Sequence, residues 1–95
     1  MYATINHWQL NTPVTELRAS MEAELLPELS QAKGFKGMFF VKEADDRCAF
    51  IVLWESPEAL ESAQPALAKG WFGKTMFPRA VGAPSRSFGE VLVSR

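Results

Sequence analysis

The sequence predicts a single α+β domain in which one four-stranded antiparallel sheet carries two helices on one face. Three observations predict this fold: a hairpin at 34–55 without a polar face, a helical pattern on each side of it, and a strand pattern near each end of the chain. Ninety-five residues fit one domain, 1–95. Because connections between parallel strands are right-handed, the order β-α-β-β-α-β predicts the ferredoxin-like topology.

The central hairpin is expected to pair strands at 38–41 and 48–54 across the acidic turn 43–46. Successive side chains of a strand point to opposite faces, and in the second strand both faces are apolar. A hairpin with one wet face would alternate apolar and polar residues, so both faces must be covered. A chain this short cannot easily cover two sheet faces by itself. We therefore expect a homodimer that packs sheet against sheet.

The first strand is expected at Tyr2–Leu10, which is rich in β-branched and aromatic residues. A helix should follow from Pro13 to about Lys33, with Thr12 as its N-cap and Gly34 ending it. The apolar stripe of this helix consists of Val14, Leu17, Met21 and Leu25.

Pro27 lies inside this helix and should kink it, because proline removes one helical hydrogen bond. On a continuous helix, Glu28 would lie on the apolar stripe and could act as a general base. The kink is expected instead to turn Glu28 toward solvent and Leu29 into the core.

A second helical region should begin with Ser56 as N-cap and Pro57 at the first helical position. Pro65 lies within it and predicts an interruption. The remaining elements are then two helical segments at about 57–64 and 66–76, a loop at 77–85 and a last strand at 86–94.

Composition argues against several classes of function. A net charge of −1 gives no support for nucleic-acid binding. No apolar run approaches the ~18–20 residues of a membrane span, and no signal peptide is visible. One histidine and one cysteine cannot make a zinc site of the usual kind, and no nucleotide-binding motif is present. The single cysteine, Cys48, is interpreted as a small buried hydrophobe, and its isolation fits a cytoplasmic location.

Charge is distributed unevenly along the chain. Residues 1–68 hold five basic and ten acidic side chains, whereas residues 69–95 hold five basic and one acidic. The basic excess has two interpretations, a solvated surface or a positive rim that attracts an anionic or phenolate ligand.

Two stretches point to a known family: GFKG at 34–37 and IVLWESPEAL at 51–60. With them, the chain resembles the antibiotic biosynthesis monooxygenase family in element order over nearly its whole length. The resemblance implies a dimeric α/β barrel, in which two sheets form a joint barrel and each subunit holds a ligand pocket between sheet and helices. Some members oxygenate anthrone- or quinol-type aromatics without metal or flavin, others degrade haem, and many have no known activity.

The resemblance implies a cofactor-independent monooxygenase acting on a small aromatic quinol, anthrone or phenol. It leaves open whether the protein is an enzyme. One alternative is a non-catalytic ligand-binding or stress-associated dimer with the same pocket. Another is a dimerisation module whose aromatic residues all belong to the core.

The candidate site residues are isolated side chains rather than a motif. Asn6 and Trp71 are the candidate catalytic residues, because each can donate a hydrogen bond to a developing enolate oxygen. The candidate substrate-binding residues are five aromatic residues and one arginine: Trp8, Phe40, Trp54, Phe72, Phe77 and Arg79.

Haem degradation is disfavoured by the histidine content. Asn6 matches, by position in the first strand, an asparagine of the haem-degrading branch of the resembled family. That branch also uses a histidine late in the second helix, and here His7 is the only histidine. His7 has no visible carboxylate partner and faces away from Asn6, so it is interpreted as a structural residue near the dimer interface.

Residues 68–86 are expected to form a gate over the pocket. Three glycines and two prolines exclude one long rigid helix there. Several large apolar side chains in the same segment should not remain in water together.

Overall fold

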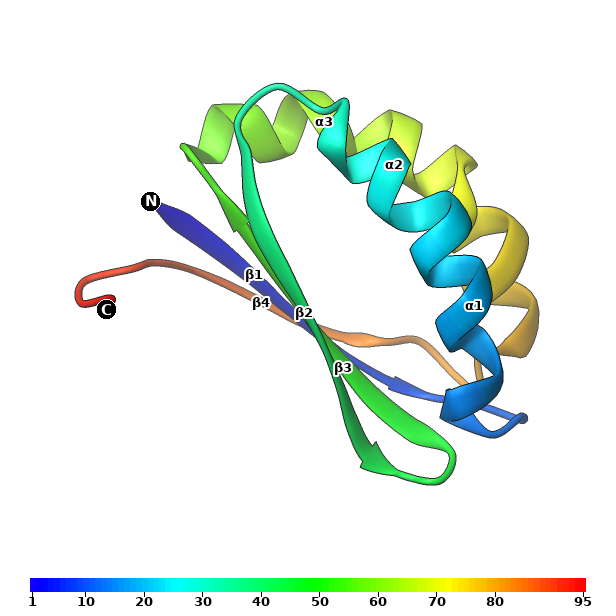
Figure 1. The fold of residues 1–95 in the computed structure, drawn as a ribbon. Coiled ribbons are helices and arrows are strands. Elements are labelled where there is room, and N and C mark those ends of the chain that lie inside the picture. Colours follow the sequence, from blue (N-terminus) through cyan, green and yellow to red (C-terminus); the bar gives the residue numbers. More distant parts are fainter.

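The structure is a computed structural model that describes the whole chain, residues 1–95. It confirms the predicted β-α-β-β-α-β order (Figure 1). The strands are β1 (Tyr2–Gln9), β2 (Phe35–Ala44), β3 (Arg47–Trp54) and β4 (Ser85–Glu90). The helical elements are η1 (Val14–Leu17), α1 (Arg18–Ser20), η2 (Met21–Leu25) and α2 (Leu26–Ser30) before the hairpin, and α3 (Pro57–Lys69), η3 (Phe72–Met76) and η4 (Phe77–Arg79) after it.

All four strands belong to one sheet in the order β2-β3-β1-β4, and every neighbouring pair is antiparallel. Figure 1 shows both helical layers on the same face of this sheet. The register of β1 places Asn6 opposite Phe50 of β3 and Arg86 of β4. Because side chains alternate along a strand, Asn6 faces the helices and His7 faces the other side, which we call the open face.

The first helical layer is one segment of changing pitch rather than a uniform α-helix. Its N-cap is Pro13, and the hydroxyl of Thr12 is buried without a hydrogen-bond partner, so the expected Thr12 cap is wrong. A π-helical turn, η2, precedes Pro27, and the N–H of Leu26 donates to the carbonyl of Met21 there. This wider turn accommodates the proline, which lacks an N–H of its own.

The residues after Pro27 follow the expectation only in part. Leu29 is fully buried, as expected. Glu28 does not turn to solvent: its Oε2 accepts a hydrogen bond of 3.1 Å from the backbone N–H of Trp71. The prediction was wrong because this acceptor role depends on a residue 43 positions away, which no local pattern reveals.

The turn into β2 requires a glycine. Gly34 has φ +86°, and a Cβ atom there would lie 2.6 Å from the Cβ of Ala59. Its carbonyl accepts from the N–H of Glu55 at 2.7 Å, which ties the turn to the end of β3. The two stretches that carry the family resemblance, 34–37 and 51–60, therefore lie side by side.

The second helical layer breaks later than expected. The hydroxyl of Ser56 accepts a hydrogen bond from the N–H of Ala59, so the predicted N-cap is confirmed. Helix α3 continues through Pro65, and the expected interruption there is wrong. Pro65 is exposed, so water can bond the carbonyl that loses its helical partner. The break occurs instead at Gly70, whose ψ of −133° is not helical.

The core lies between the sheet and the helices. Leu17, Leu25 and Leu29 from the first layer pack with Phe50 and the rest of one buried cluster. Cys48 belongs to this cluster and is fully buried, as expected for a small hydrophobe. Burial, assisted by the negative charge of Glu43, raises the pKa of the Cys48 thiol from its ordinary value of 9.0 to about 12.

The open face of the sheet has no helix over it and is apolar along the middle of the hairpin. Phe39 and Val41 of β2 are 60% and 40% exposed. The register aligns them with Ile51 and Ala49 of β3, as the alternation of the hairpin predicts. No helix of the structure is long and apolar enough to cross a membrane.

Candidate functional site

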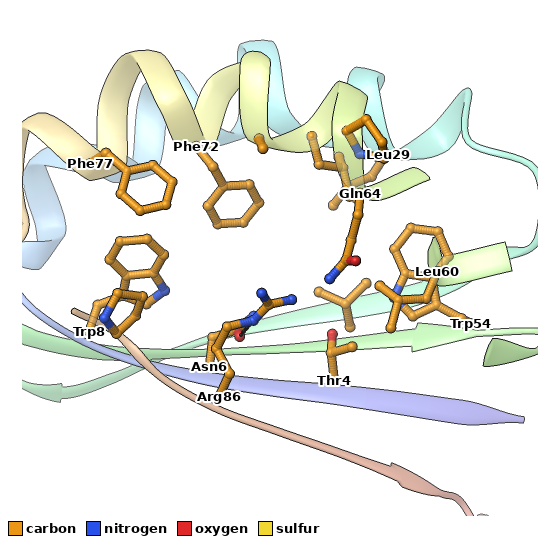
Figure 2. Close-up of a pocket in the computed structure, with 15 residues that line it drawn as sticks. Thr4, Asn6, Trp8, Leu29, Trp54, Leu60, Gln64, Phe72, Phe77 and Arg86 are labelled. Carbon is orange, nitrogen blue, oxygen red and sulfur yellow. Dashed lines mark hydrogen bonds between the residues drawn. The ribbon is translucent and has the colours of Figure 1, made fainter. Parts of the chain in front are cut away.

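A pocket of about 380 Å³ lies between the helix-bearing face of the sheet and the second helical layer (Figure 2). Its floor comes from β1, β3 and β4, and its roof from α3, η3 and η4. The walls are mostly apolar. The lining residues are Thr4, Asn6, Trp8, Leu29, Val52, Trp54, Leu60, Gln64, Pro65, Leu67, Ala68, Phe72, Phe77, Pro84 and Arg86.

One end of the pocket is built from three aromatic rings. The Trp8 indole stacks against Phe72, with ring centroids 6.1 Å apart and an interplanar angle of 19°. Phe77 meets the same indole edge-on at 5.2 Å. Trp8 rises from β1, whereas Phe72 and Phe77 descend from the second helical layer (Figure 2). A flat apolar ligand could stack on, or meet edge-on, the aromatic rings at this end.

Two buried hydrogen-bond donors of the pocket have no partner. The indole N–H groups of Trp8 and Trp54 both lack an acceptor. The side chains are nearly fully buried, at 5% and 1% exposure, and both line the pocket. Figure 2 shows them at opposite ends of it. A buried N–H without a partner is costly, so these two donors favour a ligand that carries acceptor atoms.

Asn6 is oriented by its neighbour on the edge strand. The Nε–H of Arg86 donates to Oδ1 of Asn6 at 3.2 Å, across the β1–β4 register. A guanidinium can only donate, so it fixes the carbonyl end of the Asn6 amide toward itself. The amino end of Asn6 is then left to donate to a ligand in the pocket.

The pocket wall contains donors but no acid or base. Arg86 is the only ionisable residue among the fifteen that line it. Its guanidinium lies at the cavity beside Asn6, and the amide of Gln64 and the hydroxyl of Thr4 point into the cavity (Figure 2). No cluster of three or more His, Cys, Asp or Glu side chains suited to a metal ion occurs in the structure. The pocket is therefore suited to a flat ligand with oxygen acceptors or negative charge.

The structure brings five of the eight candidate site residues together at this pocket. They are Asn6, Trp8, Trp54, Phe72 and Phe77.

Three candidates lie elsewhere. The Trp71 indole is buried beside the pocket, and its N–H donates to the hydroxyl of Ser20 at 3.1 Å. Phe40 packs on Phe50, with ring centroids 4.8 Å apart, toward the β2 edge of the sheet. The guanidinium of Arg79 donates to the carbonyl of Thr75 and does not line the pocket.

Sequence reasoning missed several lining residues, of which Thr4, Gln64 and Arg86 are polar. Thr4 shares the strand face of Asn6 and Trp8, so the period of the strand could have identified it. Gln64 follows Leu60 by one helical turn, and this spacing places both on one face of α3. Arg86 was assigned only to the basic rim, because its place beside Asn6 depends on the strand register.

The architecture defines a class: an α+β protein with a pocket between one antiparallel sheet and its helices. Within this class, the chain has the fold of the antibiotic biosynthesis monooxygenases, as the resemblance implied. SnoaB, a cofactor-independent oxygenase from Streptomyces nogalater, is 10% identical over 98% of this chain and 94% of that chain, with a TM-score of 0.78. A monooxygenase from the gene ActVA-Orf6 of Streptomyces coelicolor, solved with nanaomycin D, is 18% identical over 98% and 92%, with a TM-score of 0.71.

A haem-degrading protein shares the same fold. MhuD from Mycobacterium tuberculosis, solved with two haems in its active site, is 24% identical over 100% of this chain and 99% of that chain, with a TM-score of 0.73. The neighbours therefore do not distinguish oxygenation of an aromatic compound from haem degradation. No protein-family profile matches the sequence, and no curated protein matches it.

Proposed function

We propose that the protein is a cofactor-independent monooxygenase of the antibiotic biosynthesis type, acting on a flat aromatic compound that ionises to an enolate or phenolate. The observation that supports this most is the chemistry of the pocket wall. Apolar surfaces surround several hydrogen-bond donors, and no side chain of the wall can accept a proton as a base. Such a wall stabilises an anion that the substrate itself forms.

The proposed reaction uses dioxygen as the oxidant. The substrate, an anthrone or a quinol, loses a proton to water and becomes an enolate or phenolate. This anion passes one electron to O2, and the two radicals combine into a peroxide anion at a ring carbon, which takes a proton back from water. At the methylene group of an anthrone, loss of water then leaves a carbonyl. Overall one oxygen atom enters the ring and the other leaves as water.

The residues of the pocket have distinct proposed roles. Asn6 donates its amide N–H to the enolate oxygen, and Arg86 holds the Asn6 amide and adds positive charge. The indole N–H groups of Trp8 and Trp54 bind further oxygen atoms of the ligand. Phe72 and Phe77 hold the ring system flat and exclude water.

The protein is also proposed to be a homodimer. The support is the open face, where Phe39 is 60% and Val41 40% exposed beside Ile51 and Ala49 of β3. A second copy that packs its own open face there would remove this surface from water.

The test is oxygen consumption with a panel of anthrones, quinols and catechols, in the presence of a chelator and without added flavin. We expect uptake with at least one member and one O2 consumed per product. Asn6→Ala should lower kcat/KM by about 100-fold, in the range for loss of one oxyanion donor. His7→Ala, on the opposite face, is the matched control and should have no such effect. Absence of uptake with every member would contradict the oxygenase and favour the non-catalytic ligand-binding alternative.

Haem degradation is the second candidate, because MhuD shares the fold. The pocket does not favour it, since no His, Cys, Met or Tyr that could ligate the haem iron lines the wall. A haemin titration followed by a reductant in air separates the two functions. We expect no conversion of the porphyrin spectrum, and conversion to an open-chain product would replace the proposed substrate class with haem.

A further inference from the structure

The second helical layer is interrupted at Gly70, and this interruption determines the environment of Trp71. Instead of continuing the helical ladder, the backbone N–H of Trp71 donates to Oε2 of Glu28 at 3.1 Å. Glu28 belongs to α2, in the other helical layer. The hydrogen bond therefore joins the two layers at the point where the chain turns into η3.

Gly70 and Glu28 are matched in shape. The carboxylate of Glu28 occupies the space that a Cβ atom at residue 70 would need. Its other oxygen, Oε1, is buried and has no hydrogen-bond partner. A glycine at the break thus lets the carboxylate reach the N–H of Trp71, and any larger residue would push it away.

The side chain of Trp71 is anchored to the same layer. Its indole N–H donates to Oγ of Ser20 at 3.1 Å, and the ring is only 3% exposed. Both N–H groups of Trp71 are thus held by the first helical layer, one by Glu28 and one by Ser20.

The residue that follows Trp71 forms part of the pocket roof. The Phe72 ring meets the Trp71 ring edge-on at 5.4 Å and stacks on Trp8 at 6.1 Å. Phe77, one π-helical turn later, completes the aromatic end of the pocket (Figure 2). The placement of this roof over the sheet therefore depends on where Trp71 is held.

We propose that Glu28 is a positioning residue, which holds the aromatic roof of the pocket in its ligand-binding position through Trp71. Glu28 does not line the pocket. It lines a separate cleft of about 100 Å³, together with Glu24 and Lys74. It therefore acts through Trp71 and not on the ligand, and its kinetic consequence rests on the proposed function.

The size of the effect follows from the hydrogen bond. Without the carboxylate, the roof would leave its binding position for part of the time. The apparent affinity for a pocket ligand falls in proportion to the fraction of molecules whose roof is in that position. A hydrogen bond to a charged group is strong enough to change that fraction about tenfold. A bound substrate restores the roof, so turnover at saturation should change little.

The test compares Glu28→Ala with Glu28→Gln and with Glu24→Ala. Glutamine keeps an oxygen that can accept from Trp71, and Glu24 is an exposed carboxylate of the same cleft without that hydrogen bond. We expect Glu28→Ala to speed amide exchange at Trp71 and Phe72 at least tenfold. The dissociation constant of the anionic aromatic dye 1-anilinonaphthalene-8-sulfonate should rise about tenfold. Both controls should stay within about threefold of the wild type.

A second variant protects the test against a folding failure of Glu28→Ala. Ser20→Ala removes only the indole anchor and should raise exchange at Trp71 and the dye dissociation constant by about threefold. The proposal is overturned if Glu28→Ala shows the amide exchange and dye affinity of the wild type. If Glu28→Ala does not fold, the same result in Ser20→Ala overturns it. An equal change in Glu24→Ala would overturn it as well, since the effect would then be one of charge.

The ratio of the changes in KM and kcat distinguishes a positioning role from a purely structural one. With any substrate that is turned over, Glu28→Ala should raise KM about tenfold and leave kcat within twofold. If kcat instead falls about tenfold in Glu28→Ala, the positioning role is overturned. Exchange and dye binding need no turnover, so a failure of the proposed oxygenase leaves this test intact.

Discussion

The Nδ1 atom of His7 lies 3.1 Å from both carboxylate oxygens of Glu43, on the open face of the sheet. His7 lies on β1, and Glu43 lies at the irregularity of β2 between Lys42 and Ala44, so the two side chains meet across β3. Sequence reasoning gave His7 no carboxylate partner, and this interpretation was wrong. The pair lies on the sheet face opposite Asn6, which agrees with the alternation along β1.

His7 should therefore be dispensable for the chemistry of the pocket. We expect His7→Ala to keep kcat/KM within about twofold, measured by oxygen uptake, because no atom of His7 lines the pocket. The same change should weaken dimerisation, since it leaves Glu43 without its partner on the proposed interface. If His7→Ala remains folded and dimeric but loses activity, then the reaction takes place on the open face and the assignment to the pocket is wrong.

The proposed dimer depends on the open face, and Ile51 lies on that face in β3, one of the two inner strands of the sheet. Ile51→Glu should yield a folded monomer in size-exclusion chromatography with light scattering, because a charge cannot be buried there unpaired. Val52→Glu is the matched comparison. Val52 is 4% exposed in the core, so this change should unfold the chain rather than separate the subunits. A monomeric wild type at micromolar concentration would contradict the proposed dimer.

Trp54→Phe isolates the contribution of an unpartnered donor. The variant keeps most of the ring and removes the indole N–H, which bonds nothing in the fold. We expect the affinity for an oxygen-bearing ligand to fall about tenfold, while the free energy of unfolding falls by no more than about 2 kcal/mol from lost packing. Isothermal titration and urea denaturation measure the two quantities. Unchanged affinity would mean that the ligand does not use this donor.

Arg86 separates charge from positioning. Arg86→Lys keeps a positive charge at the pocket but replaces the guanidinium that holds Oδ1 of Asn6. We expect it to retain affinity for an anionic aromatic dye and to lose about tenfold in kcat. Arg86→Ala should lose both. If the lysine variant restores full turnover, then charge alone explains the role of Arg86.

Cys48 should make stability sensitive to alkaline pH. Its pKa is raised by burial from 9.0 to about 12, so the unfolded thiol ionises first as pH rises. The contribution of the thiol to stability is complete below pH 9 and is lost progressively between pH 9 and 12, by roughly 1.4 kcal/mol per pH unit. Urea midpoints of the wild type and Cys48→Ala at pH 8 and 10.5 measure it. The wild type should lose more, and parallel losses would contradict the prediction.

Local patterns predicted the hairpin well. Strand side chains repeat every two residues, so the faces of Phe50 and Ile51 follow from the sequence once the strand is recognised. The N-cap at Ser56 is also a local feature and was predicted correctly. Gly34 has the positive φ of a turn, but α2 ends at Ser30 with Gln31 as its C-cap, so the helix stops short of the expected Lys33. Pro65 shows the limit of local rules, since an exposed proline did not break α3.

The rest of the site depends on which distant residues meet. Arg86 reaches Asn6 only through the register of β1 and β4, and no single strand encodes that register. Phe40 is aromatic and faces the helices, as a pocket residue would. It lies on β2, however, at the sheet edge opposite β4 and away from the pocket. The contact of Glu28 with Trp71 joins two helical layers, which neither helix predicts alone.

The pocket wall has no group that changes charge near neutral pH, and this has a consequence for how rate would respond to acidity. In most enzymes a bell-shaped pH profile reports the acid and base of the protein. Here the profile would report the ionisation of whichever compound is bound, so its midpoint would move from one substrate to the next. Substituents that make the phenol more acidic would shift the midpoint down, and the protein would select among compounds by their own acidity as well as by shape.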